Sequence, residues 1–510
     1  MPPDASPVPV VLAVDVGTTA AKTTAFGPDG RRRGAGAEQG YPLDAPHPGH
    51  ATQDPARVTA AVLRTVRDVA SERRAAGDRV AGIAVSTAMH GLCALDARDA
   101  PLTAILTWAD TRASAQADRL READPGLHDR TGTPVHPMAP PAKLAWLREH
   151  DPATFAAARR WVGVKELVLH ALTGELVLDE SVASGTGLWN ASTRDWDPAA
   201  LDLVGVDAGL LAPVVRTSTV LGGLSAEAAD ATGLPAGTPV VVGAGDGPLA
   251  NLGIDAVAPG VAACSIGTSG ALRLTVDRPA VDARRRLFSY ALDDDRWVTG
   301  GAINNGGVVL RWAGAALTPD LGPHPEDALL ALAAEVPPGA EGLVLLPSLW
   351  SERAPRWRGD ATGAFVGLTA RHGRGHLVRA AVEGVCLQLA LVLASLREAG
   401  HRVDEVRATG GFSRSPLWRQ LLTDVLALPV GFPDDPEGSG RGAALVGLRA
   451  LGLDDGAGPT PPGRVLHPDG AAAATYADLL PVFADLQDAL GPGMRALRDL
   501  ASAQDPGAGP

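Results

Sequence analysis

The sequence predicts an α/β protein made of two domains of similar architecture. Its 510 residues exceed what one ordinary hydrophobic core organises, and 45% are hydrophobic against 20% charged, which is typical of globular chains. Near-continuous apolar strands alternate with helical segments, as in sheets whose parallel strands are covered on both faces. A strand-and-turn motif at Gly17–Thr18 recurs 250 residues later, at Gly267–Thr268. Such a repeat indicates two related domains.

The first copy of the motif is VVLAVDVGTTAAKTTAF, residues 10–26. It predicts a buried strand, a tight turn and a second strand, with no helix after the turn. A Gly-Thr-Thr turn offers backbone N–H groups and hydroxyls to a phosphate. The chain has no GxxxxGK[ST] sequence, so this predicted phosphate site is not a P-loop. Asp15, directly before the turn, can hold Mg²⁺ directly or through water.

Three later segments extend this pattern. VAACSIGTSGAL (261–272) is the second copy of the turn, and GTPVVVGAGDGPLANLG (237–253) predicts a strand, a glycine-rich turn and a helix. Asp246 in that turn is the best-placed carboxylate to accept a proton from an attacking hydroxyl. Gly410-Gly411 precede a predicted helix capped by Ser415, and offer a flat backbone to an adenine or ribose. Each motif alone can be a structural turn and would not decide the function, but their joint order favours phosphoryl transfer.

Composition excludes several other classes. The formal net charge is −13 and no basic run stands out, which argues against nucleic acid or an anionic membrane as the main partner. The three cysteines, Cys93, Cys264 and Cys386, lie far apart, as expected for reduced buried thiols in a cytoplasmic protein. The N-terminus lacks a signal-peptide pattern, and the apolar run 387–396 predicts a buried core helix rather than a span.

The predicted elements place these motifs. A helix is expected after Asp54 as cap and Pro55 as first residue, and a buried strand over 80–91. Further helices are expected in the segments 140–150, 151–161, 163–174, 376–400, 415–426 and 475–491. The predicted division is an N-terminal domain over 10–254, a C-terminal domain over 255–490 and a frayed tail over 491–510.

The order of these motifs resembles the FGGY family of carbohydrate kinases. MAPPAKLAWLREH (138–150) is similar to the first pattern of that family, and GAFVGLTARHGRGHLVRAAVE (363–383) to its second. The resemblance covers residues 10–490. It implies two duplicated actin-like (ribonuclease-H-like) ATPase domains with a cleft between them, with ATP and Mg²⁺ as cofactors.

The resemblance also implies roles for individual residues. Asp246 matches the position of the family's catalytic base. Asp15 and Asp246 match the positions of the aspartates that lie near the metal ion. STAMHG (86–91) and TWADTRA (107–113) match the sugar-binding wall, and Lys143 and Glu383 are expected to be structural. The positions matching ATP contacts are Gly17, Thr18, Thr19, Gly267, Thr268, Gly307, Gly410, Gly411 and Ser415. The positions matching sugar contacts are Met89, His90, Asp110 and Arg112.

Three segments, 130–146, 163–168 and 304–312, look closest to the gluconokinases of this family. The implied reaction is ATP-dependent phosphorylation of D-gluconate to 6-phosphogluconate. A gluconate site needs a cation for the carboxylate, and Arg112, His136 and Lys165 are candidates that the sequence does not rank. A xylulokinase or other pentulose kinase is the alternative.

Two other functions are less compatible with these residues. A noncatalytic sugar sensor would not need Asp246 with both Gly-Thr turns, and an Hsp70-like or actin-like assembly ATPase would not need the sugar-facing Met-His pair. The expected partners are a sugar or sugar acid and ATP, with no nucleic acid and no membrane. The resemblance leaves a homodimer open.

Overall fold

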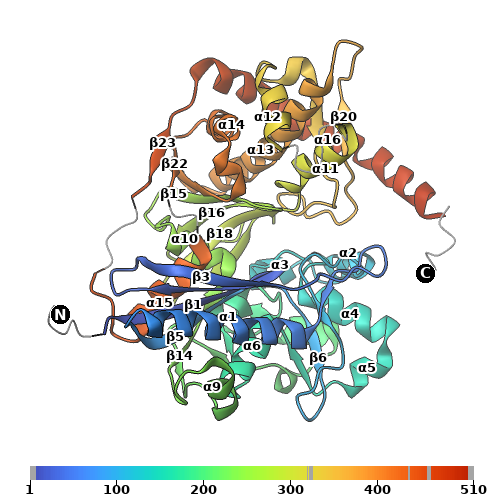
Figure 1. The fold of residues 1–510 in the computed structure, drawn as a ribbon. Coiled ribbons are helices and arrows are strands. Elements are labelled where there is room, and N and C mark those ends of the chain that lie inside the picture. Colours follow the sequence, from blue (N-terminus) through green and yellow to red (C-terminus); the bar gives the residue numbers. More distant parts are fainter. Residues whose placement is uncertain (1–6, 319, 321–325, 435–436, 457–460, 504–510) are drawn as a thin grey trace, which may run out of the picture. The chain divides into compact units, whose positions relative to one another are not determined.

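The computed structural model describes residues 7–318, 320, 326–434, 437–456 and 461–503, and is shown in Figure 1. The chain forms two compact units. The first comprises the chain up to Val257 together with Thr275–Thr299 and Glu437–Thr460. The second comprises Ala258–Leu274, Gly300–Pro436 and the chain from Pro461 onward.

Unit 1 is built on a six-stranded mixed sheet in the order β13-β14-β5-β1-β2-β3. Its strands are β1 Pro9–Val16, β2 Ala20–Phe26, β3 Arg32–Gly40, β5 Arg79–Thr87, β13 Val220–Leu221 and β14 Val240–Gly245. The predicted hairpin is confirmed, because β1 and β2 pair antiparallel around the turn at residues 17–19. The pairs β1–β5 and β5–β14 are parallel. The carboxyl ends of these three strands therefore lie at one edge of the sheet.

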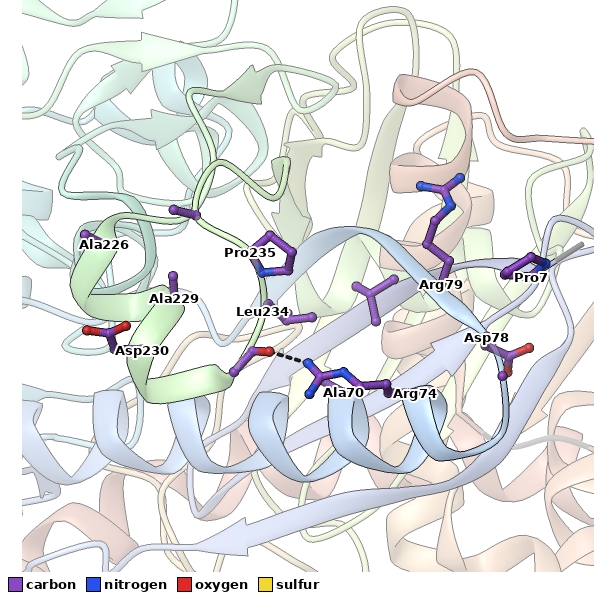
Figure 2. A pocket seen from close by; sticks show the side chains of 14 residues that line it. Pro7, Ala70, Arg74, Asp78, Arg79, Ala226, Ala229, Asp230, Leu234 and Pro235 are labelled. Atoms are coloured by element: carbon purple, nitrogen blue, oxygen red, sulfur yellow. Dashed lines mark hydrogen bonds between the residues drawn. The ribbon is translucent and has the colours of Figure 1, made fainter.

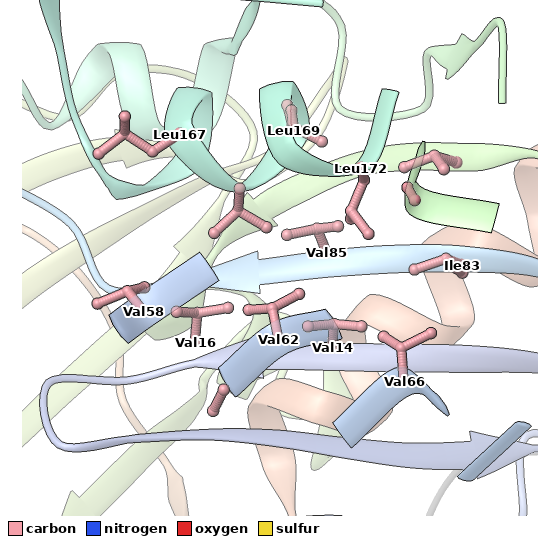
Figure 3. Close-up of a cluster of buried hydrophobic side chains, with 14 of the residues drawn as sticks. Val14, Val16, Val58, Val62, Val66, Ile83, Val85, Leu167, Leu169 and Leu172 are labelled. Carbon is pink, nitrogen blue, oxygen red and sulfur yellow. The ribbon is translucent and has the colours of Figure 1, made fainter. Parts of the chain in front are cut away.

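One face of this sheet packs against two helices, α1 Pro55–Ala75 and α6 Val164–Thr173. Figure 3 shows Val58, Val62 and Val66 of α1 meeting strand side chains such as Val14 and Val85. The start of α1 forms as predicted: Asp54 Oδ1 accepts from the backbone N–H of Ala56, and Pro55 occupies the first helical position. The apolar stripe at helical spacing thus becomes the core of unit 1.

The other face of the sheet is covered by two helices from distant parts of the sequence. Strand alternation puts Val11, Ala13 and Asp15 on this face, opposite to Val14. The covering helices are α10 Asp246–Gly253 and α15 Gly438–Ala450. Figure 1 shows α15, in orange, beside the blue strand β1. Asp15 therefore lies on the sheet face to which α10 brings Asp246.

Unit 2 repeats the hairpin-plus-parallel-strand plan. The sheet on which it is built has seven strands in the order β17-β18-β16-β15-β21-β22-β23, and β17 and the start of β18 belong to the segment 275–299 that is grouped with unit 1. Their bounds are β15 Val261–Ile266, β16 Gly270–Val276, β17 Phe288–Ala291, β18 Trp297–Ile303, β21 Glu405–Thr409, β22 Val430–Phe432 and β23 Arg464–Leu466. β15 and β16 form an antiparallel hairpin, and β15–β21 and β21–β22 are parallel. This likeness to β1, β2, β5 and β14 agrees with the repeat seen in the sequence.

The long helix α13, Arg374–Glu398, is the centre of unit 2. It is the one helix among the described residues that is long and apolar enough to cross a membrane, and 83% of its apolar window is buried inside the protein. This agrees with its prediction as a core helix. Glu383 accepts hydrogen bonds from Arg379 Nε, Tyr476 Oη and the backbone N–H of Gly339, so it has the structural role expected of it.

The remaining elements connect or cover the two sheets. The other helices are α2 Ser114–Ala123, α3 Leu127–Thr131, α4 Pro140–His150, α5 Pro152–Ala157, α7 Glu180–Ser184, α8 Pro198–Val204, α9 Ala226–Thr232, α11 Val308–Leu317, α12 Glu326–Ala334, α14 Pro416–Leu426 and α16 Gly470–Ala503. The short strands are β4 Thr52–Gln53, β6 Cys93–Leu95, β7 Ile105–Leu106, β8 Arg160–Val162, β9 Leu178–Asp179, β10 Trp189–Asn190, β11 Asp195–Trp196, β12 Val214–Val215, β19 Val344–Leu346 and β20 Ala364–Val366.

The two units differ from the contiguous division at 254/255 in two segments. Residues 275–299 belong to unit 1, where Ala291 and Trp297 pack with Val182 and Trp189. The segment that carries α15 also belongs to unit 1. The expected tail differs as well, because α16 continues to Ala503. The rest of that tail, 504–510, lies outside the described residues.

The contact between α10 and α15 depends on glycines without room for a side chain. A Cβ on Gly442 would lie 2.1 Å from the carbonyl oxygen of Leu249, and one on Gly253 would lie 1.8 Å from that of Gly438. Since the obstructing atoms are backbone, the helices must separate to admit a methyl group. Their close approach therefore fixes the position of the helix that begins at Asp246.

Gly442→Ala should lower the free energy of unfolding by about 1–3 kcal/mol, because the added methyl overpacks this contact. Gly440→Ala is the matched control in the same helix, since a Cβ there meets nothing within 4 Å. The control should be neutral or stabilising by about 0.5–1 kcal/mol through helix propensity. Urea unfolding of both variants measures the difference, and equal stabilities would contradict the packing argument.

Candidate active site

The centre of the candidate site in unit 1 is Asp15 at the carboxyl end of β1. It lies in register with Ser86 of β5, whose hydroxyl donates to Asp15 Oδ1 at 2.7 Å. Burial raises the pKa of Asp15 to about 6, and the negative charges of Asp246 and Glu437 add to the rise. A carboxylate held close to other carboxylates in this way attracts a cation.

The first Gly-Thr turn is anchored through its carbonyls. Tyr41 Oη donates to the carbonyl of Gly17 at 2.6 Å, and Gln53 Nε2 donates to that of Thr18 at 2.7 Å. Trp108 Nε1 donates to the hydroxyl of Thr18 at 2.7 Å, and Thr19 is exposed. Sequence reasoning selected Asp110 and Arg112 from the TWADTRA stretch but missed Trp108, which joins that stretch to the phosphate turn.

Asp246 lies where β14 ends and α10 begins. Gly245 is the N-cap of the helix, and Asp246 Oδ1 accepts from the backbone N–H of Gly247 at 2.7 Å. The positive end of the helix dipole favours the ionised carboxylate at this position. An ionised carboxylate is the form that a general base requires.

Met89 and His90 lie beside this strand end. Met89 fills the space next to two glycines: a Cβ on Gly245 would lie 2.6 Å from its Sδ, and one on Gly185 would lie 2.3 Å from its Cε. His90 has a left-handed backbone, with φ of 67°, and its Nδ1 lies 2.7 Å from the carbonyl oxygen of Gly185. Met89, one of the predicted sugar residues, therefore lies against the residue that precedes the predicted base.

Lys143 ties together the two loops that carry predicted sugar contacts. Its buried Nζ donates to the carbonyls of His90, Leu106 and Thr107 at 2.6, 3.1 and 2.8 Å. Burial lowers the pKa of Lys143 to about 7. The structural role expected for this lysine is thus a specific one, namely to hold the backbone on either side of the sugar wall.

Asp110 and Arg112 form one ion pair in that wall. Asp110 is fully buried and accepts from Arg112 Nε and Nη2 and from the backbone N–H of Ala51. The Arg112 side chain is 12% exposed, and its guanidinium lies 5.1 Å from the centre of the Trp146 ring. Asp110 and the tryptophan thereby orient the one guanidinium of this segment.

The other two candidate cations are placed differently. Lys165 is fully buried, and its Nζ donates to three backbone carbonyls and lies 3.3 Å from Asp179 Oδ2. This placement argues against Lys165 as the cation for a substrate carboxylate. His136 is 2% exposed, and its Nδ1 accepts from the backbone N–H of Met138 at 3.2 Å. Of the three candidates, Arg112 has the most accessible charge.

In unit 2, the second Gly-Thr turn lies against the start of α11. The backbone N–H of Gly307 donates to the carbonyl of Gly267 at 2.7 Å, and that of Gly306 to the carbonyl of Thr268 at 3.1 Å. Arg311 Nη2 donates to the hydroxyl of Thr268 at 3.2 Å. The exposed Gly267 and Thr268, the helix start at Gly307 and the guanidinium are groups suited to phosphate oxygens.

Gly410 and Gly411 follow β21, the parallel neighbour of β15. Gly410 has φ of 116°, and a Cβ there would lie 2.2 Å from the carbonyl oxygen of Ile266, so only glycine fits. Ser415 caps α14 as predicted, accepting from the backbone N–H of Trp418. The glycine pair and the second Gly-Thr turn thus lie at the same edge of the sheet, where ligands bind in open α/β sheets.

The acidic residues fit the Mg²⁺ that the family resemblance implies. Mg²⁺ is commonly bound by one or two carboxylates together with substrate phosphates. Asp15 and Asp246 supply two carboxylates whose charges act on each other. Among the described residues there is no cluster of three or more metal-binding side chains.

A cavity of about 980 Å³ lies elsewhere in unit 1, between α1 and α9. Figure 2 shows its lining residues, including Arg74, which donates to the carbonyl of Gly233, and Arg79 at the start of β5. Arg79 and Ser86 are at opposite ends of β5, roughly 23 Å apart at the usual rise of a strand. The cavity is therefore not part of the candidate site.

Two related α/β units, each with a glycine-threonine turn at the edge of its sheet, form the architecture that the sequence predicts for a two-domain kinase. Residues 10–253 match the N-terminal domain of the FGGY family of carbohydrate kinases, and residues 262–451 match its C-terminal domain. The chain belongs to the FGGY family of carbohydrate kinases.

Individual relatives support this assignment. The chain is 39% identical to a gluconokinase of Bacillus subtilis over 458 residues, which is 87% of this chain and 88% of that protein. Among solved structures, a ligand-bound xylulose kinase from Lactobacillus acidophilus has a TM-score of 0.88 at 32% identity and covers 95% of this chain and 99% of its own. A gluconate kinase from the same organism has the same TM-score and identity, covering 95% and 98%.

Asp15→Asn should stabilise the metal-free protein at pH 8. Because burial raises the pKa of Asp15 from 3.8 to about 6, the folded carboxyl binds more protons than the unfolded one between these values. Its charge therefore lowers the free energy of unfolding as pH rises through 6. Removing the charge should add roughly 1–3 kcal/mol at pH 8, after allowance for solvent screening.

Urea unfolding without Mg²⁺ at pH 8 and pH 5 measures this, with the exposed Asp29→Asn as control. The gain should shrink at pH 5, and the control should show no such change. A less stable Asp15→Asn at pH 8 would show that the charge is stabilised by its surroundings instead.

Proposed function

We propose that the protein phosphorylates the 6-hydroxyl of D-gluconate with ATP, giving 6-phosphogluconate and ADP. The observation that carries this proposal is the placement of Asp246 at the start of α10, next to Met89 and electrostatically coupled to Asp15. The gluconokinase relative supports gluconate as the substrate. The buried, unpaired cysteines are consistent with a reducing cytoplasm, where we expect the reaction to occur.

In the proposed reaction, Asp246 accepts the proton of the 6-hydroxyl as its oxygen forms a bond to the γ-phosphorus of ATP. The bond between that phosphorus and the bridging oxygen breaks, and ADP leaves with the electron pair. Asp246 later returns its proton to solvent. The Gly-Thr turns donate N–H groups and hydroxyls to the phosphates, and ordering of these donors before the reaction lowers the barrier. When bound beside Asp15, Mg²⁺ would neutralise phosphate charge.

Recognition of ATP is proposed for the edge of the unit 2 sheet. Thr268 and Arg311 can donate to phosphate oxygens, and the backbone of Gly410-Gly411 is proposed to contact the nucleoside. The hydroxyl of Ser415 is occupied by the cap of α14, which limits the contact it can make with adenine to its remaining hydrogen-bonding capacity.

Recognition of the carboxylate is proposed for Arg112. Its guanidinium is oriented by Asp110 and Trp146 and retains accessible surface. Arginine suits this role because it pairs with carboxylates in a fixed geometry. Lys165, the alternative cation, is held by backbone carbonyls and Asp179.

A pentulose kinase is the second candidate, and one observation favours it. The ligand-bound xylulose kinase is as similar in structure as the gluconate kinase. A ketopentose has no carboxylate, so it would not need the charge of Arg112.

An ADP-release assay with ATP and Mg²⁺ distinguishes these substrates. We expect turnover on D-gluconate well above that on D-xylulose, L-ribulose, glycerol or water. Arg112→Gln should raise the KM for gluconate by about 10–100-fold, the effect of about 1.5–3 kcal/mol expected for a charged hydrogen bond. If the protein prefers a ketopentose, gluconate is not its substrate, and the protein is a pentulose kinase instead.

Asp246→Asn tests the base. Loss of general-base catalysis should lower kcat by about 10²–10⁴-fold, while the KM values for ATP and sugar change little. Asp230→Asn, an exposed aspartate on α9, is the control and should retain normal turnover. Near-normal kcat in Asp246→Asn would remove this residue from the mechanism.

A further inference from the structure

We propose that Lys165 is a positioning residue for Asp246, acting together with Asp179 and Ser181 by fixing the bulged end of β14 from which Asp246 follows. This inference rests on the role of Asp246 proposed above. It gives Lys165 a function in turnover without contact with the substrate.

The starting observation is a bulge in β14. Val241 pairs with Ala84 of β5 and Ala244 pairs with Ser86, so two residues of β14 lie opposite the single residue Val85. Gly243 in the bulge has φ of 68°, and a Cβ there would lie 2.0 Å from the carbonyl oxygen of Val85. Bulges interrupt ladder hydrogen bonds and redirect the chain that follows, here the two residues that lead to Asp246.

Lys165 supplies the donors that the interrupted ladder lacks. From α6, its Nζ donates to Val242 O at 2.7 Å, Val85 O at 2.9 Å and Ala244 O at 3.1 Å. These carbonyls lie on both strands and on both sides of Gly243. One ammonium group therefore fixes the bulge, whereas buried carbonyls without donors would destabilise it.

Asp179 and Ser181 complete the arrangement from the segment that forms α7. Asp179 Oδ2 lies 3.3 Å from Lys165 Nζ, and its Oδ1 caps α7 by accepting from the backbone N–H of Val182 at 2.9 Å. The hydroxyl of Ser181 accepts from the backbone N–H of Gly245 at 3.2 Å. The residue directly before Asp246 is thus held as well, and all three side chains are fully buried.

The electrostatics agree with this role. Burial lowers the pKa of Lys165, while the charges of Asp179, Glu166 and Asp246 raise it. Because buried ion pairs add little net stability, a buried Lys-Asp pair at the base of a catalytic strand is better explained by the geometry that it imposes.

Lys165→Met tests the proposal, and Lys143→Met is its matched control. Both variants remove a fully buried ammonium that donates to three carbonyls, and Lys165→Met also leaves the buried Asp179 without its cation. Lys165→Met should lower kcat by about 10–100-fold through misplacement of the base, with the KM values for gluconate and ATP within about threefold of the original protein. Lys143→Met should mainly raise the KM for gluconate.

The second readout is coupling to the base. If Lys165 acts through Asp246, Lys165→Met should reduce kcat by less than about threefold in the Asp246→Asn background. Unchanged kcat in Lys165→Met, or an equal loss in both backgrounds, would overturn the proposal. Near-normal turnover of Asp246→Asn alone would overturn the base assignment and this inference with it.

Ser181→Ala decides the question if Lys165→Met does not fold. It removes one hydroxyl near Gly245 and should lower kcat by about 3–10-fold in the original protein but not in Asp246→Asn. No change in kcat for Ser181→Ala would then overturn the positioning role.

Discussion

The candidate site depends on hydrogen bonds that hold the irregular backbone at the carboxyl ends of the parallel strands. Chain that leaves a sheet has carbonyls without ladder partners, and these need donors when they are buried. Two buried lysines meet this need in unit 1. Lys143 binds the carbonyls of the sugar wall, and Lys165 binds those of the bulge before Asp246. The residues proposed to contact the sugar and the proposed base thus each have an ammonium group that holds their backbone, and neither lysine is proposed to contact the substrate.

Local features of the fold were predictable because local chemistry determines them. The hairpin around Gly17, the cap at Asp54, the cap at Ser415 and the strand-to-helix turn at Asp246 are confirmed. The role of Lys165 was not predictable, because a lysine in an apolar helix pattern does not reveal whether its amine faces a ligand or a bulge. Contacts group residues 275–299 and α15 with unit 1, and nothing in the sequence of these two segments indicates that packing.

The two copies of the Gly-Thr motif differ in the residue that lies two positions before the glycine. Asp15 precedes the first Gly-Thr turn, and Ser265 occupies the equivalent place before the second. Ser265 accepts a hydrogen bond from Arg273, so this position of unit 2 carries a cation rather than an acid. Both turns are proposed to bind phosphate, and at this position the first has a carboxylate where the second has a serine. The two hairpins thus share a backbone structure but differ in charge, with an acid at this position in unit 1 and an arginine beside it in unit 2.

The packing of α15 on unit 1 has a consequence for how the protein folds during translation. Gly447 lies against Val11 and Ala84, so α15 covers strands that are synthesised near the beginning of the chain. Until residue 450 has emerged, the part of that face that α15 covers and the adjoining side of α10 remain uncovered. The first unit therefore cannot finish folding before most of the second has been translated, and incomplete chains would expose an apolar surface that chaperones recognise.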